Sequence, residues 1–259
     1  MAVGKHLIIG NWKMNRTIHE GSLLVHQLDQ IVSNHRDVEV VFAPGNLSLQ
    51  SLNLQIDHNK FKLAAQNFYW RDEGAFTGEI SAYQLHGLVK YALVGHSERR
   101  HIFGESGRDI GRKVQAAIRH EIKPVLCVGE TAMERQDGET GDVLHDQLVG
   151  GLANVTSEDM KDVIIAYEPV WAIGSGKHAM PDDVVSAAAT IRRQVKHMFG
   201  ANVARDTPVL YGGSVTSDNA KAYLAAEGVN GLLVGGASLS PEPFAQIIKQ
   251  AHQSLAGRK

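Results

Sequence analysis

Eight short apolar runs recur along this chain, with helical patterns between them. The runs are continuously apolar rather than alternating, which is typical of parallel strands buried on both faces. They span residues 7–9, 38–42, 61–65, 91–94, 125–128, 163–167, 209–211 and 231–234. A strand followed by a helix, repeated eight times without a break in composition, predicts a parallel α/β fold.

The helical patterns and the chain length indicate how the strands are arranged. Apolar spacing predicts helices over residues 18–32, 184–199, 217–226 and 244–255, and Pro181 is a favoured opening residue for the second of them. A length of 259 residues would allow two domains, but α/β barrels commonly fill roughly 200–250 residues as one. We therefore predict that residues 1–259 form a single (β/α)8 barrel domain.

The alternative architecture is an open, doubly wound sheet. Such a sheet would need a glycine-rich nucleotide-binding turn after the first strand. The segment after that strand reads Gly10, Asn11, Trp12, Lys13, which is no such turn. The sequence therefore favours a closed barrel over the open sheet.

Charge and cysteine content limit the partners and the compartment. A net charge of −2 provides no general basic field for nucleic acid or anionic membranes. The first apolar stretch is too short for a signal peptide, and no run reaches transmembrane length. Cys127 is the only cysteine, so no internal disulfide can form. We expect a cytoplasmic protein with no nucleic-acid or membrane partner.

Candidate functional residues follow the strands, because parallel barrels place their chemistry at the carboxyl ends of the strands. Glu168 follows the sixth run, beside the apolar residues Val170, Trp171 and Ile173. If the segment through residue 177 closes as a lid, these residues would desolvate the carboxylate and raise its pKa towards the range of a general base. Taken alone, Glu168 would more often be a strand-capping residue.

His96 follows the fourth run and opens a predicted helix. Unpaired N–H groups in a first helical turn favour the neutral imidazole, which can donate a hydrogen bond to a carbonyl oxygen. A single histidine in this position is more often a cap or a buried structural residue. His96, Glu98 and His101 do not have the spacing of a zinc site, so no metal is expected.

Paired glycines follow the last two runs. Gly212 and Gly213 precede Ser214, and Gly235 and Gly236 follow the eighth strand. Adjacent glycines let backbone N–H groups approach an anion, and loops at this end of a barrel often hold phosphate. Either pair alone could be a simple tight turn; together they predict a phosphate site.

The remaining candidates are a cation and a rejected nucleotide loop. Lys13 follows the first strand and could neutralise an anionic substrate, although most lysines there are solvated surface charges. Residues 174–177 resemble the end of a nucleotide-binding loop, but Trp171 and His178 break that pattern. Base, imidazole, cation and phosphate loops together suit proton transfer beside a carbonyl in a small phosphorylated sugar.

Six segments, in order along the chain, resemble the triosephosphate isomerase family. They are residues 11–15 (Asn-Trp-Lys-Met-Asn), 74–79 (Gly-Ala-Phe-Thr-Gly-Glu), 94–100 (Val-Gly-His-Ser-Glu-Arg-Arg), 168–177, 211–214 (Tyr-Gly-Gly-Ser) and 234–238 (Val-Gly-Gly-Ala-Ser). The resemblance implies a TIM barrel that interconverts dihydroxyacetone phosphate and D-glyceraldehyde 3-phosphate through an enediol(ate), without a cofactor.

The resemblance also implies a role for each matching residue. Glu168 would be the base, His96 the neutral electrophile and Lys13 the cation. This family is itself the standard example of such a Glu–His pairing. Further roles are implied for Asn11 beside Lys13, for Gly174, Ser214, Gly235 and Gly236 at the phosphate, for Glu98 and Ser97 as supports, and for Phe76 and Thr77 in the contact of a homodimer.

Two residues depart from the family pattern, and two other functions compete. His178 stands where the lid usually ends in a Thr-type residue, and Arg16 stands where Gly is common. A sugar-phosphate epimerase or aldolase would need a metal cluster, a second acid or a Schiff-base lysine within a strand. A non-catalytic barrel acting as a binding or adhesion module is the other alternative.

Overall fold

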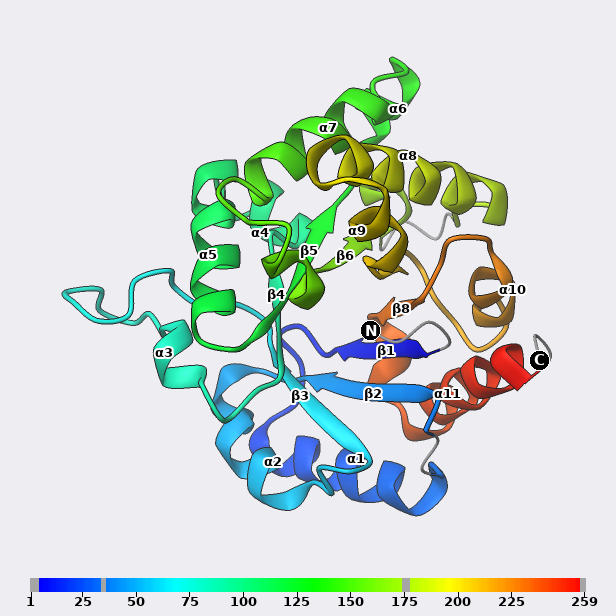
Figure 1. Ribbon diagram of the computed structural model, residues 1–259. Coiled ribbons are helices and arrows are strands. Elements are labelled where there is room, and N and C mark those ends of the chain that lie inside the picture. Colours follow the sequence, from blue (N-terminus) through cyan, green and yellow to red (C-terminus); the bar gives the residue numbers. More distant parts are fainter. Residues whose placement is uncertain (1–4, 34–35, 174–177, 257–259) are drawn as a thin grey trace.

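Eight parallel strands close into a barrel in the computed structural model, which describes residues 5–33, 36–173 and 178–256 (Figure 1). Each strand pairs with the next along the chain, and β8 pairs back with β1. The strands are β1 His6–Asn11, β2 Val38–Ala43, β3 Phe61–Ala65, β4 Tyr91–Val94, β5 Lys123–Val128, β6 Ile164–Tyr167, β7 Val209–Tyr211 and β8 Gly231–Val234. The predicted closed barrel is confirmed, and all eight apolar runs are strands.

Helices surround the barrel (Figure 1). They are α1 Ile18–Ile31, α2 Leu49–Gln55, α3 Ala82–Leu85, α4 Ser97–His101, α5 Gly107–Arg119, α6 Ala132–Gln136, α7 Thr140–Gly151, α8 Pro181–Phe199, α9 Ala201–Asp206, α10 Ala220–Ala225 and α11 Pro241–Ala256. The described residues also form short 3₁₀ helices: η1 Asn46–Ser48, η2 Asp159–Asp162, η3 Val170–Ala172 and η4 Gly236–Leu239.

Three helices begin at other residues than the sequence predicts, and the first of them is α8, which begins at Pro181 rather than at residue 184. Helix α10 begins at Ala220 rather than at residue 217, because the side chain of Asn219 accepts from the N–H of Thr216 and donates to the carbonyl of Ser214. These bonds hold residues 214–219 in a turn. Helix α11 begins earlier than predicted, at Pro241, the residue type that is favoured in the first helical position.

The barrel separates two hydrophobic cores. Alternate strand residues, such as Leu7, Ile9 and Val125, pack together inside the barrel, and the others pack against the helices. Because the strands are buried on both faces, they read as continuous apolar runs in the sequence. No helix in the described ranges is long and apolar enough to cross a membrane.

Parallel pairing brings the carboxyl ends of all eight strands to one rim of the barrel. There the backbones of neighbouring loops approach closely: a β-carbon at Gly129 would lie 1.8 Å from the carbonyl oxygen of Glu168. Only glycine fits this position without a shift of the backbone. The segment between β3 and α3 departs from this compact arrangement and projects from the barrel (Figure 1).

Candidate active site

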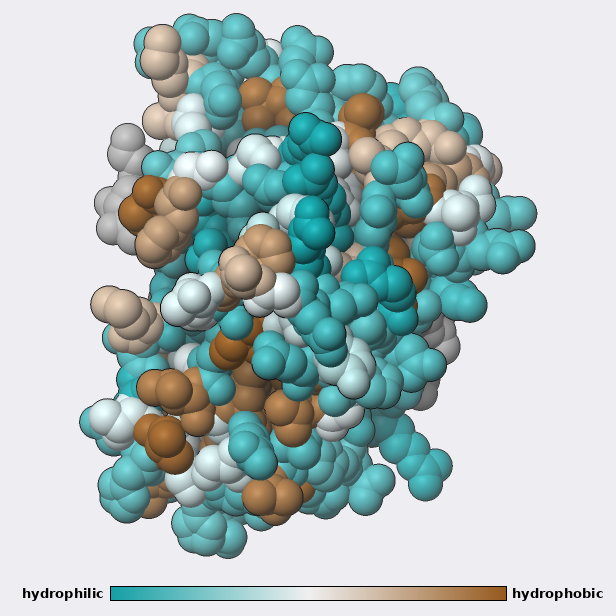
Figure 2. Space-filling view, turned by 90° about the vertical axis from the view of Figure 1, so that its left-hand side faces the viewer, coloured by the Kyte–Doolittle hydropathy of each residue, from teal (hydrophilic) through white to brown (hydrophobic). Residues whose placement is uncertain are grey.

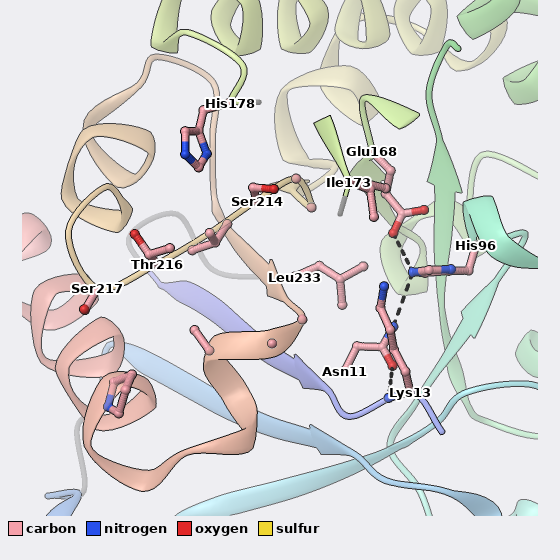
Figure 3. Close-up of a pocket in the computed structure, with 17 residues that line it drawn as sticks. Asn11, Lys13, His96, Glu168, Ile173, His178, Ser214, Thr216, Ser217 and Leu233 are labelled. Atoms are coloured by element: carbon pink, nitrogen blue, oxygen red, sulfur yellow. Dashed lines mark hydrogen bonds and ion pairs between the residues drawn. The ribbon is translucent and has the colours of Figure 1, made fainter. Parts of the chain in front are cut away.

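A cavity of about 620 Å³ opens at this rim (Figure 3). Glu168 and His96 lie at one end of it, and the loops after β7 and β8 form the other end. Asn11, the last residue of β1, and Lys13, just after it, line the cavity between these ends. The barrel therefore brings together residues from widely separated parts of the sequence, as predicted from their positions after the strands.

Glu168 is 2% exposed and holds both carboxylate oxygens in contacts. Oε2 accepts the backbone N–H of Ser97 at 3.0 Å, and Oε1 lies 3.0 Å from Nε2 of His96. Burial alone would raise the pKa of Glu168, but these two contacts, with Lys13 nearby, lower it below its ordinary value. The rise in pKa that was predicted for closure of the segment through residue 177 stays a prediction, since residues 174–177 lie outside the described residues.

His96 is the N-cap residue of α4, as its place before a predicted helix indicated. Its Nδ1 accepts the backbone N–H of Glu98 at 3.3 Å, so in the neutral ring Nε2 carries the proton and donates to Glu168. Burial would lower the pKa of His96, but the adjacent Glu168 carboxylate raises it above the ordinary value. The prediction of a lowered pKa is corrected here, because it did not include the contact with Glu168.

Lys13 has an unusual backbone that is fixed by its neighbours. Its φ of 53° is uncommon for a residue with a side chain. The N–H donates to Oδ1 of Asn11 at 3.1 Å, and the carbonyl accepts from Nε2 of Gln66 at 2.9 Å. The ammonium lies 2.6 Å from Oε1 of Glu98. Glu98 thus holds the Lys13 ammonium at the edge of the cavity.

The turn after β8 lines the end of the cavity opposite Glu168, whereas the turn after β7 begins beside Glu168: a β-carbon at Gly212 would lie 3.0 Å from Cγ of Glu168. A β-carbon at Gly235 would lie 3.7 Å from Cε of Lys13, so the lysine stem runs beside the turn after β8. Within the described chain, the backbone N–H groups of Ser214, Gly235 and Gly236 make no loop or turn hydrogen bond. The Ser214 hydroxyl, in contrast, donates to the carbonyl of Ala172 at 2.5 Å. Gly174 lies outside the described residues.

Trp171 does not line the cavity in this arrangement. Its Nε1 donates to Oε1 of the fully buried Glu130 at 2.9 Å, and the guanidinium of Arg135 stacks on its ring. Tyr167 also donates to Glu130, at 3.0 Å. Of the three apolar residues beside Glu168, Ile173 is the one that lines the cavity.

The structure also shows a role for Arg100, which the sequence prediction includes only as part of residues 94–100. Its Nε donates to the carbonyl of Gly95 at 2.7 Å, and a second nitrogen donates to the carbonyl of Cys127 at 2.8 Å. These bonds fix the turn that carries His96. Leu233, Thr216, Ser217 and Pro243, also absent from the sequence prediction, line the cavity.

Comparison with known proteins relates this site to one enzyme family. The family model for triosephosphate isomerase matches residues 6–251. The chain belongs to the triosephosphate isomerase family. It is therefore an enzyme of the isomerase class.

Curated relatives match over nearly the full length. The triosephosphate isomerase of Chloroherpeton thalassium is 44% identical over 249 residues, covering 95% of this chain and 99% of that protein. That of Citrifermentans bemidjiense is 42% identical over 246 residues, covering 95% and 98%. That of Chlamydia muridarum is 45% identical over 249 residues, covering 95% and 91%.

Arg16 and His178, the two departures from the family pattern, lie in the described structure. Arg16 has a φ of 72°, the left-handed region in which glycine is favoured, and its guanidinium donates to the carbonyl of Leu239. This bond offers a reason for an arginine at a strained position. His178 is exposed and lines the cavity.

Proposed function

We propose that this chain interconverts dihydroxyacetone phosphate and D-glyceraldehyde 3-phosphate by proton transfer through an enediol(ate), in glycolysis and gluconeogenesis. One observation carries this proposal. A buried carboxylate and a buried imidazole lie 3.0 Å apart at one end of a cavity, and the other end presents backbone N–H groups that make no loop or turn hydrogen bond within the described residues. A triose phosphate has a reacting carbonyl at one end and a phosphate at the other, which matches this polarity.

Glu168 is the base in this proposal. Its lowered pKa in the free enzyme keeps it ionised at neutral pH and able to accept a proton. Substrate that enters between Glu168 and His96 breaks their contact and leaves the carboxylate buried without that partner. Burial then raises the proton affinity of Glu168 at the step where it takes the proton from carbon.

His96 and Lys13 stabilise the charge that develops on oxygen. The Nε2 proton of His96, released from Glu168, can donate to the carbonyl oxygen of the substrate. The Nδ1 acceptor bond to Glu98 keeps that proton on Nε2. The Lys13 ammonium supplies a positive charge between the two ends of the substrate, and Asn11 Nδ2, 3.3 Å from Nε2 of His96, lies beside the same oxygen position.

The phosphate end is assigned to backbone groups. The N–H groups of Ser214, Gly235 and Gly236 would donate to the phosphate oxygens. The two glycines have no Cβ, so the phosphate can approach their backbone closely. Glu98 and Ser97 are assigned supporting roles, since Glu98 holds Lys13 and the Ser97 N–H holds Glu168. Gly174 is kept as a further candidate on the resemblance alone.

We also propose a homodimer, with Phe76 and Thr77 in the contact. The ring of Phe76 packs on Tyr69 at 4.6 Å, while Thr77 is exposed. Large apolar side chains of the loops after β1 and β4 are exposed as well: Met14 is 100% exposed and Phe103 67%. Figure 2, viewed from the side of the projecting segment, shows hydrophobic side chains gathered on this face. A second copy of this chain would cover them.

We also propose that the protein is located in the cytoplasm.

An isomerisation assay with glyceraldehyde 3-phosphate as the only substrate tests the proposed activity. Glu168→Gln keeps the shape but loses the base, so turnover should fall about 10²–10⁴-fold. Competitive inhibition by inorganic phosphate should persist, because backbone groups hold the phosphate. The exposed Glu227→Gln is the matched control and should keep full activity.

Two results would contradict this assignment. Normal turnover of Glu168→Gln would remove Glu168 as the base. Absence of isomerisation by the unmodified protein would favour the non-catalytic barrel, the alternative left open by the sequence.

A further inference from the structure

Four titratable side chains line the cavity within the described residues. Lys13, His96 and Glu168 belong to the proposed reacting end. The fourth, His178, has no place in that chemistry. It lies on the side of the cavity formed by the loop after β7, with its ring near Ser214 and Thr216 and across the cavity from Glu168 (Figure 3).

The backbone at His178 is anchored although the side chain is exposed. The next residue, Ala179, is 1% exposed, and its carbonyl accepts the hydroxyl of Tyr223 at 2.8 Å. This contact joins the chain just before α8 to α10. Within the described residues, the imidazole makes no hydrogen bond or ion pair, so its polar atoms are available to a ligand.

A phosphate group bound at this end of the cavity would face little uncompensated positive charge. The Lys13 ammonium is 2.6 Å from the Glu98 carboxylate, so part of its charge is already compensated. Neighbouring elements add acidic groups: Asp182 and Asp183 open α8, and Asp218 lies in the turn after β7. Asp183 is paired with Arg135 at 2.8 Å. Tyr223 and Tyr211, whose ring centroids lie 4.2 Å apart, are further titratable groups beside this segment.

We propose that protonated His178 binds the phosphate group of the substrate. This inference rests on the proposed function and adds a phosphate-binding residue to it. A phosphate monoester carries between one and two negative charges near neutral pH, because its second pKa is about 6. Histidine gains its proton over the same range, between about pH 8 and pH 5. The affinity of the cavity for the phosphate group of the substrate therefore increases as His178 becomes charged.

Steady-state kinetics at pH 6 and pH 8.5 test this. In His178→Gln, KM for glyceraldehyde 3-phosphate should rise about three- to fivefold at pH 6, the scale of one exposed ion pair, and approach the unmodified value at pH 8.5. Because the variant and the unmodified protein are compared at each pH, titration of the substrate itself cancels. The inhibition constant of inorganic phosphate should change by the same ratio, and kcat should change less than KM.

His178→Lys and His26→Gln complete the design. A lysine keeps its charge, so His178→Lys should bind phosphate tightly at both pH values. It should lose the part of the pH dependence of KM that comes from His178. His26 is exposed on α1, so His26→Gln serves as the matched control. Reciprocally, inorganic phosphate should raise the pKa of His178 in an NMR titration, since coupling between two binding events is mutual.

The same KM ratio at both pH values, with no effect of phosphate on the titration of His178, would overturn the proposal. Failure of the proposed function looks different: the unmodified protein would show no isomerisation at all. Loss of folding in His178→Gln would appear in its unfolding curve, and His178→Lys with the NMR titration would then decide.

Discussion

Glu168 and His96 contact each other in the free enzyme, and this contact lowers the pKa of Glu168 and raises that of His96. The positions of both residues could be predicted from sequence, because parallel strands bring their carboxyl ends to one rim. Their pKa directions could not, because these depend on a 3.0 Å contact between side chains from the turns after β6 and β4. The place of the Trp171 side chain could not be predicted either, because it depends on a hydrogen bond to Glu130, which follows a different strand.

At the residue scale, ligand binding should reverse the shift of His96. Its pKa should lie above the ordinary value in the free enzyme and fall when a planar enediolate mimic separates the ring from Glu168. Burial lowers the pKa of His96, and in the complex the attraction to Glu168, the largest interaction that raises this pKa, is removed. A ¹⁵N NMR titration with and without the mimic measures this. Free Glu168→Gln should also show a lower pKa for His96, and equal values in both proteins would refute the explanation.

At the element scale, strands were predicted more closely than helix ends. Strand limits follow from burial on both faces, whereas helix ends depend on local hydrogen bonds such as those of Asn219. Helix α5 is another case. After Arg119, the N–H of Glu121 donates to the carbonyl of Ile118, and that of the buried Ile122 donates to the carbonyl of Ala117. This is a Schellman motif, which places Glu121 in the left-handed region at φ 58°.

Glycine at this position should stabilise the protein. Glu121 is exposed, so Glu121→Gly removes the steric cost of the left-handed backbone and should add about 0.5–1 kcal/mol to the free energy of unfolding. Urea unfolding at fixed protein concentration measures the change. Glu121→Ala is the matched control: it removes the charge but keeps the β-carbon, and should give no such gain. Equal stability of the two variants would mean that backbone strain is not the cause.

At the scale of the whole molecule, the exposed apolar surface supports the proposed homodimer. Thr77→Glu would place a carboxylate in the proposed contact, where removal from water without a partner is costly. We expect monomers of low activity, measured by light scattering and by the isomerisation assay. Asn202→Glu, on the exposed side of α9, introduces the same charge elsewhere and should leave mass and activity unchanged. A normal dimer mass for Thr77→Glu would exclude Thr77 from the contact.

Pairing of β1 with β8 has a consequence for biosynthesis. The ribosome makes β1 before all other strands, yet one of its two partners, β8, is made after all of them. Until β8 emerges, β1 keeps an edge of unpaired N–H and C=O groups, which other chains can join. Such long-range pairing is slow compared with helix formation, and incomplete species that expose strand edges tend to aggregate. The nascent ring is therefore most dependent on chaperones just before its last strand is translated.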